Sequence, residues 1–320
     1  MKVYSIGTAT LDVFFIFDDL VFLKNPNFLK EKNEVKEIFI DVGGGGLNFA
    51  YNFKNLGLNS IAIIKLGQDF VGKIIKNRID EKNINCIIKY TKGNSALSFI
   101  FLSKKGEKYI FTYRGAEVFN KNDIIYDRNS AYLISTGNTS LETWLYVVNK
   151  LKKNNNIIGI VPSKHFLSKK EAVEILNKIN FFTLNLEEAK ILLKTKENDE
   201  IIIAKKLKDK FKKTDIILLT LGEKGTILIK KENIYLSEAY RKFKTIDTTG
   251  AGDSYASTFF SILLKNNWRL EENVLFLALK LSAVNVAYNL REIGAQTGLL
   301  KEKDLIKFKN ISLNIKSIVK

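Results

Sequence analysis

Residues 247–256, DTTGAGDSYA, combine two aspartates with a glycine-rich turn, and an apolar segment follows directly. Apolar residues recur in that segment with a helical period, which predicts a helix that begins near Ala251 and buries Phe259 and Leu263 on one face. The first N–H groups of a helix have no acceptor inside the helix, so they attract phosphate, and the helix dipole adds to this attraction. This predicted helix start is therefore suited to hold a phosphate group.

Asp253 lies in the first turn of this predicted helix, where its carboxylate has two uses. It can cap the helix by accepting a backbone N–H bond, or it can act as a general base that takes a proton from a nearby hydroxyl. A hydroxyl held between Asp253 and the γ-phosphate of ATP would bring base and phosphate together. The glycine turn favours the second interpretation, whereas Asp247 lies outside the helix start and is expected to shape the loop.

A second glycine cluster, DVGGGGLNFAYN, occupies residues 41–52 and opens another predicted helix over residues 47–57. It lacks the Lys-Ser/Thr of a P-loop, and no G-x-G-x-x-G pattern follows the first predicted strand, so neither nucleotide-binding motif is supported. The cluster can be a tight strand-to-helix turn. It can also admit a polyol close to the backbone, with Asn48 binding the hydroxyl groups and Asp12 supplying a charged acceptor.

Two further polar segments suit a nucleotide and its metal ion. Asn185 and Glu188 lie on one side of a predicted helix start, where they can cap the helix or support Mg²⁺ from its outer shell. Residues 220–225, TLGEKG, are typical of a strand, a turn and a second strand. The glycines of that turn would let a nucleotide lie against the backbone.

The elements that must position these residues alternate along most of the chain, which predicts an α/β fold: a mostly parallel central sheet with helices on both faces. In such sheets ligands bind beyond the carboxyl ends of the strands. Asp12, Asn185 and Thr220 each follow a predicted strand, so we expect them at one edge of the sheet. The predicted strands cover residues 2–6, 60–66, 131–136, 157–161, 181–184 and 215–221, and further helices are predicted over 187–194 and 270–290.

Two regions interrupt the alternation. Residues 12–42 contain two β-rich segments with no convincing helix between them, and residues 84–114 contain INCIIKY, ALSFIFL and EKYIFTYR, joined by the hairpin-like links TKGNS and SKKGE. We interpret both regions as one small antiparallel sheet outside the main sheet. Such a sheet would serve as a lid over a cleft or as an interface with another subunit.

Composition restricts the class of protein. No apolar run reaches the roughly 18 residues that cross a bilayer, and the first residues lack a signal-peptide cleavage site. The single cysteine, Cys86, permits no intrachain disulfide, and with one histidine it leaves no ligands for a zinc site or a histidine triad. We therefore expect a cytoplasmic protein with no membrane segment.

The formal net charge is +17, which could indicate binding to nucleic acid. The lysines are dispersed, however, and basic and aromatic residues do not interleave in a stripe. We expect solvated basic faces and no nucleic-acid partner.

Several of these segments resemble, in order, the motifs of the ribokinase-like (PfkB) carbohydrate kinases. They are GGGGLN (43–48), GQDFVG (67–72), NLEEA (185–189), TLGEKG (220–225), DTTGAGD (247–253) and GAQ (294–296). The resemblance covers residues 3 to about 300, and DTTGAGD is its most specific part. It implies one kinase domain over residues 1–320, a three-layer α/β/α fold, and a β lid from about 12–42 and 84–114 that often forms a homodimer.

The resemblance also implies roles for individual residues. Asp253 would be the general base, and the backbone of Gly250, Ala251 and Gly252 would form an anion hole for the transferring phosphoryl group. The remaining positions match the sugar site (Asp12, Gly43, Gly44 and Asn48), the Mg²⁺–phosphate motif (Asn185 and Glu188) and the nucleotide loop (Thr220, Gly222 and Gly225). Asp247 matches a position near a monovalent-cation site in some members, which makes K⁺ a candidate cofactor beside ATP and Mg²⁺.

Two positions depart from the ribokinase pattern and bear on the substrate. Gly45 stands where ribokinases commonly carry lysine, and Glu117 stands where many sugar kinases carry Asn or Asp. Arg114 would either bind a carboxylate or phosphate of the substrate or pair with Glu117.

The sequence therefore predicts an ATP-dependent kinase that phosphorylates a hydroxymethyl group of a sugar-like molecule. The alternatives are a nucleoside kinase, with Phe99, Phe101 and Tyr113 as a base-stacking wall, and a non-catalytic sugar-binding regulator.

Overall fold

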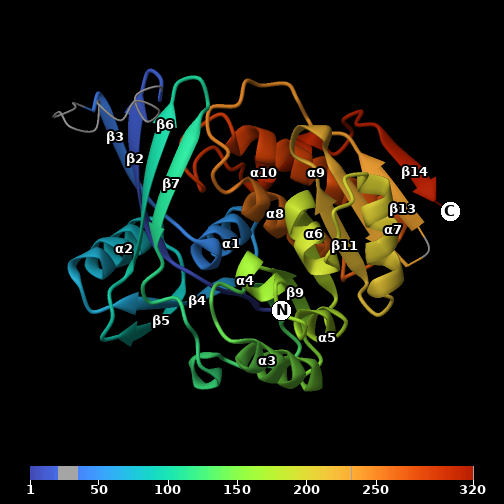
Figure 1. The fold of residues 1–320 in the computed structure, drawn as a ribbon, viewed down its shortest axis with the longest axis horizontal. Helices are drawn as coiled ribbons and strands as arrows, with labels where there is room; N and C mark the ends of the chain where they lie inside the picture. Colours follow the sequence, from blue (N-terminus) through green and yellow to red (C-terminus); the bar gives the residue numbers. More distant parts are fainter. Residues whose placement is uncertain (21–34, 232, 320) are drawn as a thin grey trace.

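A large sheet runs through the molecule in the order β14-β13-β12-β11-β10-β9-β8-β1-β4-β5 (Figure 1). This computed structural model describes residues 1–20, 35–231 and 233–319. The strands are β1 (Val3–Ile6), β4 (Ser60–Gly67), β5 (Cys86–Thr91), β8 (Ala131–Ser135), β9 (Ile157–Val161), β10 (Phe181–Asn185), β11 (Ile216–Thr220), β12 (Thr226–Lys230), β13 (Asn233–Ser237) and β14 (Ile315–Val319). All six strands predicted from the alternation are present.

Seven adjacent strands of this sheet are parallel to one another: β5, β4, β1, β8, β9, β10 and β11. The strands β12, β13 and β14 extend the sheet with antiparallel pairing. The chain begins in the middle with β1, continues outward through β4 and β5, and returns to β8 on the other side of β1. A reversal of this kind opens a crevice beyond the carboxyl ends of the strands, where ligands bind in open α/β sheets.

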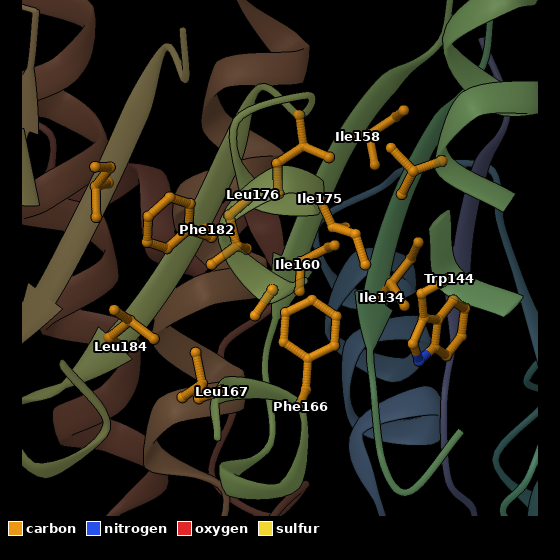
Figure 2. Packing of buried hydrophobic residues seen from close by; sticks show 14 of the residues in the cluster. Ile134, Trp144, Ile158, Ile160, Phe166, Leu167, Ile175, Leu176, Phe182 and Leu184 are labelled. Atoms are coloured by element: carbon orange, nitrogen blue, oxygen red, sulfur yellow. The ribbon is translucent and has the colours of Figure 1, made fainter. Parts of the chain in front are cut away.

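Helices cover both faces, which confirms the predicted three-layer α/β/α fold. One face carries α3 (Leu141–Lys153), α4 (Lys164–Leu167), α5 (Ala172–Leu176), α6 (Leu186–Leu193) and α7 (Glu200–Lys210), and the other carries α1 (Gly45–Asn55), α2 (Phe70–Glu81), α8 (Ala251–Lys265), α9 (Glu272–Asn289) and the short α10 (Glu302–Leu305). Strand side chains alternate between the two helical layers, because successive strand residues point to opposite faces. Ile134 packs in the hydrophobic cluster on the first face, and Leu133 packs in the cluster on the second face. Figure 2 shows Trp144 and Phe166 packed against the strands of the first face.

The helix starting in the glycine cluster differs from its predicted bounds. It was expected over residues 47–57, whereas α1 runs from Gly45 to Asn55. Gly45 and Gly46 are poor helix formers, but both are buried, and packing outweighs helix propensity there. Helix α8 begins at Ala251 as predicted.

Four strands form the predicted small sheet: β2 (Thr10–Phe17), β3 (Glu37–Gly43), β6 (Ala96–Ser103) and β7 (Lys108–Tyr113), in the order β3-β2-β6-β7. It projects from one end of the molecule (Figure 1). The outer pairs β2/β3 and β6/β7 are antiparallel, while the central pair β2/β6 is parallel. The expectation of no helix between the first two strands concerns residues 21–34, which lie outside the described residues.

One strand assigned to the small sheet belongs elsewhere. The segment INCIIKY forms β5, which pairs in parallel with β4 in the large sheet. Its side chains reach the clusters on both faces, Ile87 on one and Ile88 on the other, so it needs a layer on each side. The link TKGNS therefore crosses between the two sheets instead of forming a hairpin, whereas SKKGE does join the hairpin β6–β7.

No helix in the described part of the chain is long and apolar enough to span a bilayer.

Candidate active site

Helix α8 begins in the glycine turn where the sequence predicted a helix start suited to phosphate. Gly250 is its N-cap residue, with φ 78° and ψ 0°, and no side chain caps the helix. A Cβ at Gly250 would lie 2.6 Å from the Cβ of Ala295 and 2.7 Å from its Cα, so the turn requires glycine. A Cβ at Gly252 would meet nothing within 4 Å. The N–H group of Ala251 donates to the backbone oxygen of Thr248 at 3.3 Å, and open space lies beside Gly252.

Within the described residues the Asp253 carboxylate accepts no backbone N–H bond of α8, so it does not cap the helix. Its Oδ2 atom instead accepts a hydrogen bond from Nδ2 of Asn48 on α1, at 2.7 Å. Burial raises the pKa of Asp253 to about 6; the Asn48 bond opposes this rise, and the charge of Glu188 adds to it. A carboxylate with this pKa is largely ionised at neutral pH and can accept a proton from a hydroxyl.

A buried polar cluster joins α1 to α8 one turn further along both helices. Nδ2 of Asn52 donates to Oγ of Ser257 at 2.8 Å and to Oγ1 of Thr258 at 2.9 Å. Asn285 of α9 donates to Oδ1 of Asn52 at 3.1 Å and to the same threonine at 2.9 Å. These residues are all fully buried. The cluster therefore holds the helices in the relation that brings Asn48 to Asp253.

A second set of contacts continues from Asn48 toward the small sheet. Nε2 of Gln296 donates to Oδ1 of Asn48 at 3.1 Å, and Nζ of Lys82 donates to Oε1 of Gln296 at 2.9 Å. The same ammonium donates to Oδ2 of Asp41 on β3 at 2.7 Å. Sequence reasoning did not place Gln296 or Lys82 in the site. Gln296 ends the GAQ motif, which was the available signal, whereas Lys82 follows α2 with no signal at all.

The small sheet presents a polar row to the interior. Asp41, Asp12, Ser98 and Thr112 lie directly opposite one another on β3, β2, β6 and β7, and directly opposite residues share one face of a sheet. Asp12 was expected after a strand of the main sheet, but it lies within β2 of the small sheet. The bounds of the strands explain this difference: the main-sheet strand β1 ends at Ile6, and β2 of the small sheet begins at Thr10, before Asp12.

Asp12 is a buried acceptor at the first glycine cluster. Thr10 donates to its Oδ1 atom at 2.9 Å. A Cβ at Gly43 would lie 2.0 Å from Oδ2 of Asp12, so any side chain there would displace the carboxylate. Burial raises the pKa of Asp12 to about 6, against hydrogen bonds from Thr10 and Ser98 that lower it. Gly44 is the N-cap of α1. The predicted sugar-site residues Asp12, Gly43, Gly44 and Asn48 are therefore brought together.

Arg114 pairs with Glu117, one of the two arrangements expected from the sequence. Nη1 of Arg114 lies 3.5 Å from Oε2 of Glu117; the arginine side chain is 56% exposed and the glutamate 3%. Burial raises the pKa of Glu117, and its Oε1 atom has no hydrogen-bond partner within the described residues. A substrate contact of Arg114 stays a prediction.

The predicted nucleotide loop and the start of α8 line the same cavity, which has a volume of about 630 Å³. Thr220, Gly222 and Gly225 contribute one side, and Ala251 and Gly252 contribute the end. Sequence reasoning missed the rest of the lining, which includes Tyr240, Phe243 and Thr248 of the preceding loop and Ala283, Val286, Ala287 and Leu290 near the end of α9. The predicted helix over 270–290 contained the last four of these residues, but no pattern marked them as cavity-lining.

Asn185 and Glu188 form a reciprocal capping box at the start of α6. Oδ1 of Asn185 accepts the N–H of Glu188 at 2.9 Å, and Oε2 of Glu188 accepts the N–H of Asn185 at 2.8 Å. Burial raises the pKa of Glu188. Within residues 1–20, 35–231 and 233–319, no three Asp, Glu, His or Cys side chains gather as a ready-made metal site. Support of a hydrated Mg²⁺ from its outer shell fits this pair better than direct coordination.

Asp247 anchors the loop before α8. Its Oδ1 atom accepts bonds from the N–H of Thr249 at 3.0 Å and from Nζ of Lys108 at 3.1 Å, and its Oδ2 atom accepts the N–H of Gly294 at 3.0 Å. Lys108, at the start of β7, also donates to Oγ1 of Thr248 at 2.9 Å and of Thr249 at 3.0 Å. The ammonium of Lys108 thus contacts the carboxylate of Asp247, the residue that was predicted to lie near a monovalent-cation site.

A carboxylate with a raised pKa beside a helix start, at the end of a cavity of about 630 Å³, is compatible with phosphoryl transfer to an alcohol. The family model described as pfkB family carbohydrate kinase matches residues 2–297. The chain therefore belongs to the pfkB family of carbohydrate kinases, and it is a kinase of that class.

Individual relatives act on different substrates. The chain is 27% identical over 328 residues to the ribokinase of Dictyostelium discoideum, covering 94% of this chain and 98% of that protein. It is 24% identical over 303 residues to the nucleoside kinase of Methanocaldococcus jannaschii, covering 93% of each. The structure of Arabidopsis thaliana ribokinase with ribose and ATP has a TM-score of 0.78 at 18% identity, covering 97% of this chain and 99% of that chain, which shows a shared fold.

Proposed function

We propose that this kinase transfers the γ-phosphoryl group of ATP to a hydroxymethyl group of a sugar or sugar-like molecule, with Asp253 as the general base. The observation that carries the proposal is the position of Asp253. Its carboxylate lies in the first turn of an uncapped helix, touches Asn48 and has a pKa raised to about 6 by burial. A base of this kind matches a hydroxyl acceptor placed next to a bound phosphate.

The acceptor would bind between the two sheets. Asp12 and Asn48 offer a charged acceptor and an amide at the glycine cluster, which suits a molecule rich in hydroxyl groups. Asp253 would then take the proton of the reacting hydroxyl. The N–H groups of Gly250, Ala251 and Gly252 would stabilise the negative charge that develops on the transferring phosphoryl oxygens.

ATP would occupy the 630 Å³ cavity, with its phosphates at Ala251 and Gly252 and its nucleoside between Thr220, Gly222, Gly225 and the end of α9. Mg²⁺, when bound with ATP, would neutralise phosphate charge, and Asn185 and Glu188 would orient its water ligands. Lys164 lies near this pair of residues, because its charge lowers the pKa of Glu188 and it lines the adjoining cavity with Asn185.

The replacement Asp253→Asn tests this proposal. It removes the base and preserves the size of the side chain, so turnover should fall about 10³-fold while ATP and acceptor still bind. A coupled ADP-release assay across pentoses, hexoses, sugar acids, phosphosugars and nucleosides first identifies the acceptor. Calorimetry then measures binding to the variant. Asp304→Asn, an exposed change on α10, is the control, and near-normal turnover of Asp253→Asn contradicts the assignment of the base.

A nucleoside acceptor is the second candidate, favoured by the similarity to a nucleoside kinase. The predicted base-stacking wall does not support it. Phe99 follows Ser98 on β6, so its side chain points away from the face that carries Asp12, and it stacks with Phe15 instead at 6.1 Å between ring centroids. Phe101 and Tyr113 lie on the same outer face, by the same alternation.

That outer face supports a homodimer, which we propose as the assembly. Phe99, Tyr109, Phe111 and Tyr113 are each at least 39% exposed there and share this face with Ile38 and Ile40 of β3, on the far side of β2. Monomers rarely leave an apolar patch of this kind open to water, and two copies could bury it symmetrically. Light scattering should detect a dimer that Phe111→Lys converts to a monomer. A wild-type monomer at micromolar concentration contradicts the proposal.

A further inference from the structure

Four side chains form one hydrogen-bond chain from the small sheet to Asp253. Lys82 Nζ donates to Gln296 Oε1, Gln296 Nε2 donates to Asn48 Oδ1, and Asn48 Nδ2 donates to Asp253 Oδ2. The lengths are 2.9, 3.1 and 2.7 Å, so every step is an ordinary hydrogen bond. Lys82, Gln296 and Asn48 come from three separate parts of the sequence.

Lys82 determines which group donates and which accepts at each step of this hydrogen-bond chain. An amide can turn by 180° and exchange its donor for its acceptor, so Asn48 alone could present either atom to Asp253. A lysine ammonium has three donors and no acceptor. It therefore requires the oxygen of Gln296 to face Lys82, which leaves the Gln296 amide to donate to Asn48. The Asn48 oxygen is then engaged, and its N–H group must face Asp253.

Within the described residues, the side-chain amides of Asn48 and Gln296 make no hydrogen bonds besides those of this hydrogen-bond chain. Asn48 is 5% exposed and Gln296 is 2% exposed, so bulk water does not replace a lost partner. The Lys82 side chain is 20% exposed, its ammonium pairs with Asp41 at 2.7 Å, and it lies 5.2 Å from the ring centroid of Tyr51.

We propose that Lys82 is a positioning residue for the catalytic base: acting through Gln296 and Asn48, it keeps an amide N–H directed at Asp253. This inference rests on the proposed role of Asp253. If Asn48 turned, its oxygen would face the carboxylate, which would favour the protonated form of Asp253 and leave less of the base ready to react. The other charged group that faces Asp253 is Glu188 of α6, whose effect is in the same direction as that of burial.

The variants Lys82→Met and Gln296→Met interrupt the chain at different steps, and the second does so without changing charge. Lys82→Arg keeps a group that only donates. Lys54→Met is the charge control: Lys54 lies on α1 and its ammonium donates to the backbone oxygen of Lys82 at 2.6 Å, whereas the hydrogen-bond chain to Asp253 starts from the Lys82 side chain.

The readout is the pKa of Asp253 in the free protein, measured by carbon-13 NMR of labelled aspartate carboxyl groups. The Asp253 signal is assigned by its absence in Asp253→Asn. Both methionine variants should raise this pKa by about one unit, the equivalent of one hydrogen bond to a charged group. Lys82→Arg and Lys54→Met should leave it near the wild-type value. The acid limb of kcat/KM should move to higher pH by the same amount in the two methionine variants.

An unchanged Asp253 pKa in folded Lys82→Met and Gln296→Met protein overturns the proposal. An equal shift in Lys54→Met overturns it as well, because charge alone would then explain the effect. The titration does not depend on turnover. If the pKa shifts as expected but Asp253→Asn keeps its activity, the assignment of the base is wrong while the orienting effect of Lys82 on Asp253 stands.

Discussion

Two parts of the molecule form the walls of the proposed active-site cleft: helices α1 and α8 on one side and the small sheet on the other. The two walls differ in how far they are buried. The wall formed by α1 and α8 is buried almost completely: every residue of α8 from Ser254 to Leu264 is buried, and the amides of Asn52 and Asn285 join it to its neighbours. The small sheet has one face open to water, with Phe111 60% and Tyr113 55% exposed. Among the described residues, its tip reaches the catalytic loop through Lys108, whose ammonium contacts Asp247, Thr248 and Thr249.

From this difference we infer which wall serves which part of the proposed reaction. In the proposed function the buried wall holds the base, the helix start and one end of the nucleotide cavity, and preorganised groups of this kind act on the transition state. In the proposed function the small sheet supplies Asp12 and polar neighbours to the acceptor, while Leu11 and Val42 pack it against α1 and α2. Changes in the first wall should therefore affect folding and kcat, and changes in the second should affect KM.

Asn52→Leu should give the largest effect, because it leaves Asn285, Ser257 and Thr258 without their shared partner in a buried site. The free energy of unfolding should fall by about 2–3 kcal/mol, measured by urea denaturation. Asn55→Leu, at a partly exposed position of the same helix, is the matched control and should change it by less than about 0.5 kcal/mol. A loss below about 1 kcal/mol in Asn52→Leu would show that the cluster does not hold this wall.

Asp12→Ala should raise KM for the acceptor about tenfold or more, the effect of losing a hydrogen bond to a charged group, and should change kcat little. Steady-state kinetics at saturating ATP measure both constants. Asp18→Ala, just beyond the end of β2, removes an exposed carboxylate that pairs with Lys104 and serves as the control. An unchanged KM in Asp12→Ala would remove the small sheet from the acceptor site.

Lys108→Met should give the smallest effect, a loss of about fivefold in kcat/KM, equivalent to one ordinary hydrogen bond. It leaves the buried carboxylate of Asp247 without its ammonium partner, so K⁺ or NH₄⁺ should restore activity to the variant and have little effect on the wild type. Lys105→Met on the same hairpin is the control. Strong K⁺ activation of the wild-type enzyme would show that Lys108 does not serve as the cation at this loop.

The sequence predicted the layered fold and most of the residues now found around the cleft. It was wrong about β5 because INCIIKY has the composition of any short strand, and only the helices above and below it show that it belongs to the large sheet. It expected Asp12 at the edge of the main sheet because Asp12 follows the first predicted strand, whereas Asp12 lies within β2 of the small sheet, which begins at Thr10. It missed Lys82 because a single lysine after a helix is typical of a solvated surface.

Local chemistry was determined by the sequence itself. Glycine at position 250 and the apolar period after it specify a helix with an open, phosphate-attracting start, whatever the rest of the chain does. The use of each polar group was decided only by tertiary structure. Asp253 acts as a base candidate instead of a cap because α1 brings Asn48 to it, and Asn48 keeps its orientation because Gln296 and Lys82 arrive from distant segments. A hydrogen bond depends on the distance and direction between its two partners, and folding alone sets these for residues more than 200 positions apart.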